Sequence, residues 1–404
     1  MADAPRPDRK GNPKEQANTK ALDFEMPPTA TAPALYLDKA ETVDRFLGEI
    51  ADVTELALDT EGASFHRFLD RIYLLQISTR DRSAIIDPLP IGAAARLGAL
   101  LENKSVEVVF HDADYDLRLL HQDYGWHVTR IFDTRIASQL LGIKSFGLAA
   151  LLEQFFDVKL DKKHQRADWS MRPLPADMLE YAAQDTRYLL QLKDHMKADL
   201  ERRGRLHWAE EEFARLEGTR WDAEDAMEGF LRLKGARELT RPELAVLREL
   251  VKWRDTMAAQ LDRATFRIVG NEVLLELSRR PPKTVTELAA VKGMPKGMLD
   301  RAGGDIIAAI QRGLGVQESD LPRFPKAQRW NKDQEFDARV IRLKGVRDEA
   351  AKTLELDPGV LCSRERLENI ARSGAKTIAD LAAVPDIRRW QIEVMGAGFI
   401  SALR

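Results

Sequence analysis

The amino-acid sequence has 404 residues, of which 44% are hydrophobic and 31% charged, and its formal net charge is −3 at pH 7. This length exceeds what one hydrophobic core normally organises, so we expect two or three domains of a soluble globular protein. No apolar run is long enough to cross a bilayer and no apolar signal core opens the chain, so we expect a cytoplasmic protein with no membrane partner. Cys362 is the only cysteine, which excludes an intramolecular disulfide and a thiolate zinc site.

The small net charge conceals an asymmetry between the two halves of the chain. Residues 1–230 carry a formal charge of −11, whereas residues 231–313 carry +6 and residues 321–404 carry +4. The near-neutral total argues weakly against a nucleic acid partner, but the basic back half can attract a polyanion.

In the front half, residues 31–215, short apolar runs alternate with longer helical patterns. Residues 1–30 are rich in Pro, Lys, Asp and Ala without periodicity, so we expect a disordered tail. Strands are predicted over 55–64, 72–79, 83–88 and 106–112. Helices are predicted over 42–51, 93–102, 116–125, 135–143, 148–156 and 177–196. A mixed sheet flanked by helices is the simplest arrangement, which makes this an α/β domain.

After about residue 208 the strand pattern disappears, and the back half has the pattern of short amphipathic helices. This half contains an internal repeat at an offset of 93 residues. Arg254-Asp255 aligns with Arg347-Asp348, and residues 287–291 align with 380–384. Two related all-α domains are therefore predicted. The expected limits are 216–235 for a connecting segment, 236–316 for the first helical domain, 317–324 for a linker and 325–404 for the second helical domain.

Two acids, Asp59 and Glu61, directly follow the first apolar strand pattern. Side chains two apart on a strand point to the same face, so both carboxylates project together from the strand end and repel each other. Taken alone, an Asp-x-Glu pattern is more often a strand-end turn with two solvated acids.

Three further acids, Asp112, Asp114 and Asp116, lie between a predicted strand and the helix that follows it. Helix capping and the helix dipole favour acids at this position, and we expect Asp112 and Asp114 to be caps. Asp116 immediately precedes the apolar stripe of the helix, which places it toward the edge of the sheet.

Tyr181 and Asp185 are four residues apart within a predicted helix, so both lie on one helical face. Between them, Ala182 and Ala183 are small enough to let the helix approach the sheet closely. Taken alone, this pattern indicates an ordinary surface pair.

Together, the four acids Asp59, Glu61, Asp116 and Asp185 can converge from two strand ends and one helix. Mg²⁺ and Mn²⁺ prefer carboxylate oxygens, and two such ions about 3.5–4 Å apart stabilise the attacking and leaving oxygens of a phosphodiester displacement. Tyr181, with a reference pKa of about 10, is a poor base at neutral pH but can orient the attacking water. The sequence therefore predicts two divalent metal ions, Mg²⁺ or Mn²⁺, as cofactors.

The order of these motifs, Asp59-x-Glu61, then Asp116 in HDADYDL, then Tyr181-x-x-x-Asp185, resembles the DEDDy branch of the DnaQ-like 3′-5′ exonucleases. The segments DRIYLLQIST, FDTRIASQLLG and LDKKHQRADWSMRPLPADMLEYAAQDTRYLL are more specifically similar to the ribonuclease D family, and the two repeats look like HRDC domains. This resemblance implies a ribonuclease H-like α/β mixed sheet flanked by helices, followed by two all-α HRDC-like domains.

Carried over to matching positions, the resemblance implies that the four acids bind the two metal ions and that Tyr181 orients the water. The histidine-bearing branch has a histidine where this sequence has Glu180. The implied activity is that of a 3′-5′ exoribonuclease that releases 5′-mononucleotides. The implied substrates are RNAs, namely tRNA precursors and other small structured RNAs with 3′ extensions, and we expect a monomer.

Two alternative functions remain open. A 3′-5′ DNA exonuclease of the same branch would share the motifs, although no polymerase or helicase module follows and the HRDC pair favours ribonuclease D. A non-catalytic RNA-binding protein with an exonuclease fold would be expected to have lost a carboxylate, yet all four acids and Tyr181 are present.

An exonuclease must clamp the 3′-terminal nucleotide with stacking side chains and cations. Phe65 and His66, just beyond the first motif, and Gln76 on the next strand are suitably placed, although His66 is more often a solvated loop histidine. By resemblance, Gln165, Arg166 and Trp169 are also candidates for substrate binding. Packing against the neighbouring Pro and Leu is an equally good interpretation of Trp169.

The basic excess of the first helical domain can attract phosphates, although a charge excess is often only a solvated face. Trp253 lies at helical spacing with apolar neighbours, so we expect it in the core. The candidate nucleic-acid-binding residues are Lys234, Arg237, Arg254, Arg263, Arg267, Arg279, Arg280 and Lys283.

Overall fold

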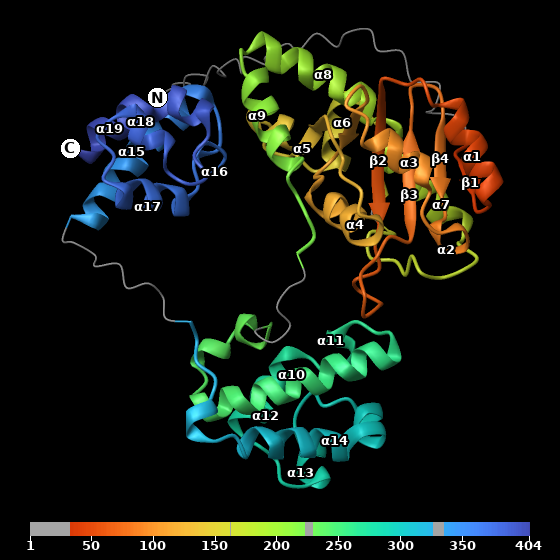
Figure 1. The fold of residues 1–404 in the computed structure, drawn as a ribbon, viewed down its shortest axis with the longest axis vertical. Coiled ribbons are helices and arrows are strands. Elements are labelled where there is room, and N and C mark those ends of the chain that lie inside the picture. Colours follow the sequence, from red (N-terminus) through yellow and green to blue (C-terminus); the bar gives the residue numbers. More distant parts are fainter. Residues whose placement is uncertain (1–32, 162, 223–228, 326–334) are drawn as a thin grey trace, which may run out of the picture.

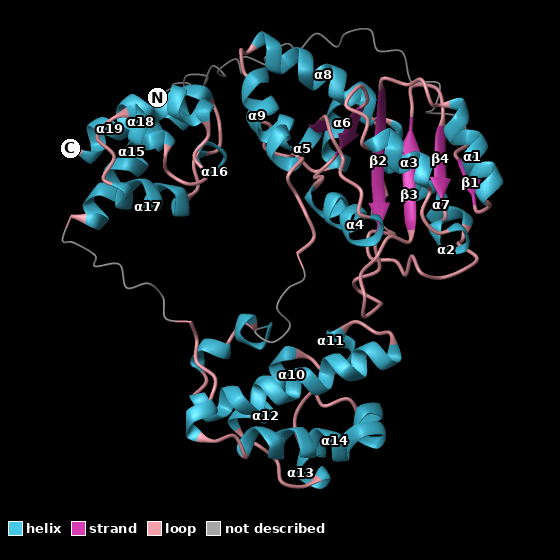
Figure 2. Cartoon of the chain, viewed as in Figure 1, coloured by secondary structure: helices cyan, strands magenta, loops and turns pink. Residues whose placement is uncertain are grey.

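The computed structural model describes residues 33–161, 163–222, 229–325 and 335–404. It contains one α/β domain followed by two helical domains (Figure 1). All strands of the described chain lie in the first domain, and the back half is helical, as expected (Figure 2). The tail expected over residues 1–30 lies outside the described residues.

The α/β domain is built on a six-stranded mixed sheet in the order β1-β4-β3-β2-β5-β6. β2 is antiparallel to β3 and β3 to β4, whereas the other pairs are parallel. The predicted mixed sheet is confirmed, but the three-residue edge strands β1 and β6 are too short to show alternation in the sequence. The strands are β1 (Leu35–Leu37), β2 (Glu55–Glu61), β3 (Leu74–Ser78), β4 (Ser83–Ile86), β5 (Glu107–Phe110) and β6 (Ile131–Asp133).

Helices cover both faces of this sheet, since α1, α3 and α4 pack on one face and α5, α6, α8 and α9 on the other. The helix predicted over 177–196 is two helices, because α7 ends and α8 begins on either side of Tyr188. The helices are α1 (Ala40–Glu49), α2 (Pro88–Ile91), α3 (Ala95–Leu101), α4 (Asp114–Tyr124), α5 (Thr134–Leu140), α6 (Leu148–Phe156), α7 (Ala176–Arg187), α8 (Leu189–Arg202) and α9 (Leu206–Leu216).

Successive side chains of the central strand β2 point to opposite faces of the sheet, and each face has its own core. Leu56 and Leu58 pack into the core on the α1, α3 and α4 side, whereas Ala57 packs into the core on the α8 side. Continuing this alternation, Asp59 and Glu61 share the face of Ala57. α7 packs against β2, β3 and β4, with Ala182 and Ala183 buried, as their small size predicts.

The first helical domain contains two long helices, α10 and α14, that pack against each other. Its core includes Phe230, with Phe324 packed against it, so the packed body extends on both sides of the expected 236–316. Trp253 is in this core, as predicted. The elements are η2 (Gly229–Arg232), η3 (Ala236–Glu238), α10 (Arg241–Leu261), α11 (Thr265–Ile268), α12 (Asn271–Arg279), α13 (Val285–Ala289), α14 (Lys296–Leu314) and η4 (Glu318–Asp320).

The second helical domain repeats the local structure of the first at the same offset of 93 residues. Thr284 and Thr377 both cap a short helix by accepting a backbone N–H bond. Arg254 and Arg347 both donate to the aspartate that follows them. Its elements are α15 (Phe336–Leu354), α16 (Pro358–Leu361), α17 (Arg364–Ser373), α18 (Ile378–Ala382) and α19 (Arg389–Leu403).

This second domain is attached to the α/β domain through α9, which lies beside it in Figure 1. Trp208 of α9 stacks on Trp390 of α19, with ring centroids 5.0 Å apart. Glu212 accepts hydrogen bonds from Arg388 at 2.9 Å and from the Trp390 indole at 3.0 Å. The apolar residues of both domains form one continuous buried cluster, so the two domains share a core.

We expect Trp390→Ala to lower the free energy of unfolding by about 3–5 kcal/mol, because it removes a fully buried ring from this shared core. Urea unfolding measures the effect. Trp221→Ala is the matched control, since Trp221 is 41% exposed and its loss should cost less than about 1 kcal/mol. Equal destabilisation by the two substitutions would show that the Trp208–Trp390 stack does not hold the domains together.

Candidate active site

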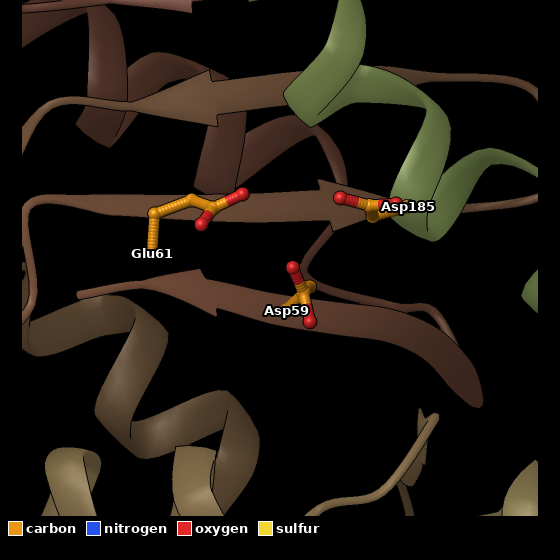
Figure 3. Close-up of side chains that lie close together, drawn as sticks. All are labelled: Asp59, Glu61 and Asp185. Carbon is orange, nitrogen blue, oxygen red and sulfur yellow. The ribbon is translucent and has the colours of Figure 1, made fainter. Parts of the chain in front are cut away.

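Three carboxylates meet at the end of β2. Asp59 and Glu61 come from one face of the strand, and Asp185 comes from α7, which crosses that face (Figure 3). One carboxylate oxygen from each lies within 4.8 Å of the others. Each of the three side chains is only partly exposed, so the acids are close together and poorly solvated.

The like charges of these three carboxylates repel one another. Burial raises the pKa of Asp59 well above its usual range, and the charge of Asp185 raises it further. Burial and then the charge of Asp59 likewise raise the pKa of Glu61. Burial raises the pKa of Asp185 to about 7. Within the described chain, no lysine or arginine forms an ion pair with any of the three.

The fourth acid, Asp116, stands beside this group rather than within it. Its helix, α4, packs on the opposite face of the sheet, and the Thr60 hydroxyl donates to its carboxylate at 2.6 Å. Asp116 is buried, which raises its pKa, and the charge of Asp59 raises it further. Thr60 is a site residue that the sequence analysis missed, because a hydroxyl between two acids carries no signal of its own.

These acids fit a divalent metal ion by their chemistry. The donor set is all carboxylate oxygen, which Mg²⁺ and Mn²⁺ prefer. Burial and then the charges of neighbouring carboxylates raise the pKa values of all four acids. A bound cation would supply positive charge to balance the carboxylates.

Gln76 supports Glu61 from the neighbouring strand β3. Its side chain is fully buried, and its amide nitrogen donates to the Glu61 carboxylate at 3.3 Å. The antiparallel pairing of β3 with β2 turns Gln76 toward the acids, and its predicted contact with substrate stays a prediction. Its amide oxygen has no hydrogen-bond partner in the described chain.

Tyr181 lies on α7 one turn before Asp185, between His164 and Trp169. The ring centroids are 5.7 Å from His164 and 6.1 Å from Trp169. Burial and then the charges of Asp185 and Glu61 raise the pKa of Tyr181 above its usual range. The phenol is therefore a neutral hydrogen-bond donor at physiological pH.

Trp169 does not offer a stacking surface to a nucleotide. It is only 1% exposed and packs in a cluster with Met178 and Ala182. Its assignment to substrate binding is wrong and the packing interpretation is correct, because the segment before α7 folds its indole under the helix.

The remaining substrate candidates lie on two loops that contact each other, one after β2 and one before α7. His66 donates from Nε2 to the Arg166 backbone carbonyl at 3.0 Å. The Arg166 guanidinium lies 5.2 Å from the centre of the Phe65 ring. Phe65, Gln165 and Arg166 are exposed, whereas His66 is partly buried. Phe65, Gln165 and Arg166 are therefore open to solvent.

Asp112 and Asp114 are not helix caps, contrary to the prediction. Asp112 has a left-handed φ of 70° and pairs with Arg135, and Asp114 pairs with Arg118 at 2.8 Å. α4 begins after Ala113 without a side-chain cap, because the left-handed turn directs the Asp112 carboxylate away from the helix start.

Asp133 connects the starts of two helices. Its carboxylate caps α5 by accepting from the backbone N–H groups of Arg135 and Ile136. It also accepts from the Ala113 N–H at 2.8 Å, at the start of α4. Asp133 thereby fixes the helix that carries Asp116.

The candidate nucleic-acid-binding residues of the first helical domain differ in their exposure to solvent. Arg254 is buried and donates to Asp255 and Asn271, so its assignment to phosphate binding is wrong. The sequence around Arg254 resembles that around the exposed arginines, but the Arg254 side chain faces the core. The other candidates are exposed: Lys234, Arg237, Arg263, Arg267, Arg279, Arg280 and Lys283.

A separate cleft of about 1440 Å³ lies between α5, α6 and the second helical domain, away from the carboxylates. Among the described helices, none has the length and apolar character needed to span a membrane.

Comparisons with known proteins agree with this architecture. Residues 35–201 match the model of a 3′-5′ exonuclease domain, and residues 243–310 and 336–403 each match the HRDC domain. The chain is 30% identical over 350 residues to a ribonuclease D of Pseudomonas paraeruginosa, an alignment that covers 86% of this chain and 92% of that protein.

Two solved structures also resemble the whole chain. A protein from Bifidobacterium adolescentis has a TM-score of 0.80 at 25% identity, over 94% of this chain and 99% of that chain. RNase D of Escherichia coli, described as an exoribonuclease involved in structured RNA processing, has a TM-score of 0.71 at 23% identity, over 92% of this chain and 99% of its own. The latter likeness shows a common fold.

We expect Thr60→Val to weaken Mn²⁺ binding about 10- to 100-fold, because the Asp116 carboxylate loses the hydroxyl that holds it. Isothermal titration calorimetry with Mn²⁺ measures the dissociation constant. Thr129→Val is the matched control, since the buried Thr129 hydroxyl has no hydrogen-bond partner among the described residues. Unchanged Mn²⁺ affinity in Thr60→Val would contradict a role for Asp116 at the metal site.

Stability without metal should depend on the charge of Asp185. Its pKa is about 7 in the folded chain and about 4 when unfolded, so its contribution to stability is lost as pH rises through this range. In excess EDTA, we expect Asp185→Asn to raise Tm relative to the wild type by clearly more at pH 8 than at pH 5. A Tm difference that is the same at both pH values would contradict this electrostatic account.

Proposed function

We propose that this chain, which belongs to the ribonuclease D family and is a 3′-5′ exoribonuclease, hydrolyses RNA at a site for two divalent metal ions, Mg²⁺ or Mn²⁺. Asp59, Glu61, Asp116 and Asp185 would hold the ions, and Tyr181 would orient the attacking water. The observation that supports this assignment is the group of three uncompensated carboxylates on β2 and α7, with Asp116 beside it.

The chain's own residues prepare this site for phosphodiester hydrolysis. When bound, the divalent ions neutralise the carboxylates and stabilise the charge that develops on the phosphate. Gln76 and Thr60 hold Glu61 and Asp116 by hydrogen bonds. The neutral Tyr181 hydroxyl can donate to or accept from a water next to Asp185, which positions that water for attack on the terminal phosphodiester.

We further propose that the substrates are tRNA precursors and other small structured RNAs with 3′ extensions, and that the product is the 5′-mononucleotide. The basic charge of the two helical domains supports RNA binding, since residues 231–313 carry +6 and residues 321–404 carry +4. The related Escherichia coli enzyme is described as acting in structured RNA processing. We propose that the chain acts as a monomer in the cytoplasm.

The two alternative functions are less well supported. A non-catalytic RNA-binding protein would not need uncompensated acids around a hydrogen-bonded Gln76 and Thr60. A DNA exonuclease would share the acids, but several relatives that match most of this chain are named ribonuclease D.

Degradation of a 3′-extended tRNA and of single-stranded DNA, assayed side by side, tests the proposal. We expect 5′-mononucleotides from the RNA in Mg²⁺ or Mn²⁺, and none in excess EDTA. Asp185→Asn should reduce turnover at least 100-fold and leave tRNA binding within about threefold, because it removes a metal ligand and not a large RNA contact. Asp114→Asn, at an exposed acid outside the cluster, is the control that should keep activity.

A clear preference for DNA would overturn the RNA assignment. Activity of Asp185→Asn within a few-fold of the wild type would show that the metal site is elsewhere.

A further inference from the structure

Two exposed phenylalanines from different domains meet at the loop that follows the acidic end of β2. Phe65 follows Glu61 by four residues in the loop between β2 and β3, and Phe266 lies on α11 of the first helical domain. Their ring centroids are 6.4 Å apart and their planes are inclined by 74°. Phe65 is nevertheless 43% exposed and Phe266 51% exposed, so the contact leaves much of both rings open to solvent.

Polar contacts hold the segment before Phe266, residues 262–264, against the loop between β2 and β3. The Ala264 N–H donates to the His66 carbonyl at 3.2 Å. Arg67 donates to the Asp262 carboxylate at 3.2 Å. Figure 1 shows the loop after β2 reaching down toward α11. These hydrogen bonds hold the two domains together at this point, so the Phe65–Phe266 contact is not needed for the attachment.

The residues that follow Phe266 anchor it to the core of its own domain. Ile268 and Val269 are fully buried in the core of the first helical domain. Phe266 is therefore on the outward side of a short, anchored helix. Arg263 and Arg267 flank it in sequence and are exposed, and neither forms an ion pair within the described chain.

Across the domain boundary, Arg166 adds a further cation to the surface. Its guanidinium lies 5.2 Å from the centre of the Phe65 ring. Exposed aromatic rings flanked by cations are the surface on which single-stranded nucleic acids bind, because bases stack on the rings and phosphates contact the cations. Large apolar side chains that only seal an interface are normally buried.

We propose that Phe266 is an RNA-binding residue that the first helical domain contributes to the entrance of the active site. Phe266 and Phe65 together form a stacking surface for a base of the single-stranded 3′ segment, and Arg263 and Arg267 contact the neighbouring phosphates. This inference rests on the proposed function and adds a residue outside the α/β domain to the substrate site.

Three substitutions of Phe266, assayed on an RNA hairpin with a single-stranded 3′ extension, test the proposal. Phe266→Ala removes the ring, Phe266→Leu keeps apolar volume without an aromatic face, and Phe266→Tyr keeps the aromatic face. We expect the Ala and Leu variants to raise KM roughly 5- to 150-fold, the range for one lost base stack, with kcat within about twofold. The Tyr variant should behave like the wild type.

Two controls separate stacking from a structural role. Val285→Ala, at a 44% exposed apolar residue of the same domain, should leave KM unchanged. A dinucleotide substrate, too short to extend beyond the terminal site, should be hydrolysed equally well by the wild type and Phe266→Ala.

Two results would overturn the inference: a KM for Phe266→Ala within twofold of the wild type, or a Phe266→Leu variant as good as the wild type. The second result would show that Phe266 only packs. Failure of the wild type to release nucleotides would instead contradict the proposed function. In that case, fluorescence anisotropy of the labelled hairpin still tests the inference. Stacking predicts that Phe266→Ala raises the Kd for the hairpin by the same factor as that expected for KM.

Discussion

Mutual repulsion among poorly solvated carboxylates is the constraint on which the rest of the site depends. β2 turns Asp59 and Glu61 to the same face, and α7 can add Asp185 because the small residues before it let the helix lie against the sheet. Hydrogen bonds from Gln76 and Thr60 then hold two carboxylates in place despite the repulsion. A chain selected only for stability would not keep this arrangement, because removing the charges would relieve the strain. The cluster is consistent with selection for cation binding.

The strands of the sheet centre and the acidic motifs could be predicted because both depend on local spacing. A period of two places Asp59 and Glu61 together, and a spacing of four places Tyr181 above Asp185. What could not be predicted depends on which side of an element faces a neighbour. Arg254 has the same local pattern as exposed arginines but faces the core. Phe266 gave no signal, because its partner is 201 positions away in the sequence and its role exists only where two domains meet.

The two helical domains arose from one repeat, but they are attached to the α/β domain in different ways. The first touches it through a loop, with a few hydrogen bonds and one exposed aromatic contact. The second shares a continuous apolar core with it and adds an ion pair between Glu212 and Arg388. The first attachment leaves polar and aromatic groups free to meet a ligand, whereas the second mainly adds rigidity. The same fold is therefore attached by a small polar and aromatic contact in one copy and by a shared apolar core in the other.

The shared core also has a consequence for the order in which the chain folds during synthesis. α9 ends at Leu216, and one side of it packs on β6 through Phe213 and Phe132. The other side, with Trp208, is covered by α19, which ends at Leu403. At the usual rate of translation, this apolar surface stays uncovered for about 10–40 s after α9 leaves the ribosome. Until the last helix is synthesised, the Trp208 side of α9 therefore lacks the partner that buries it in the folded chain.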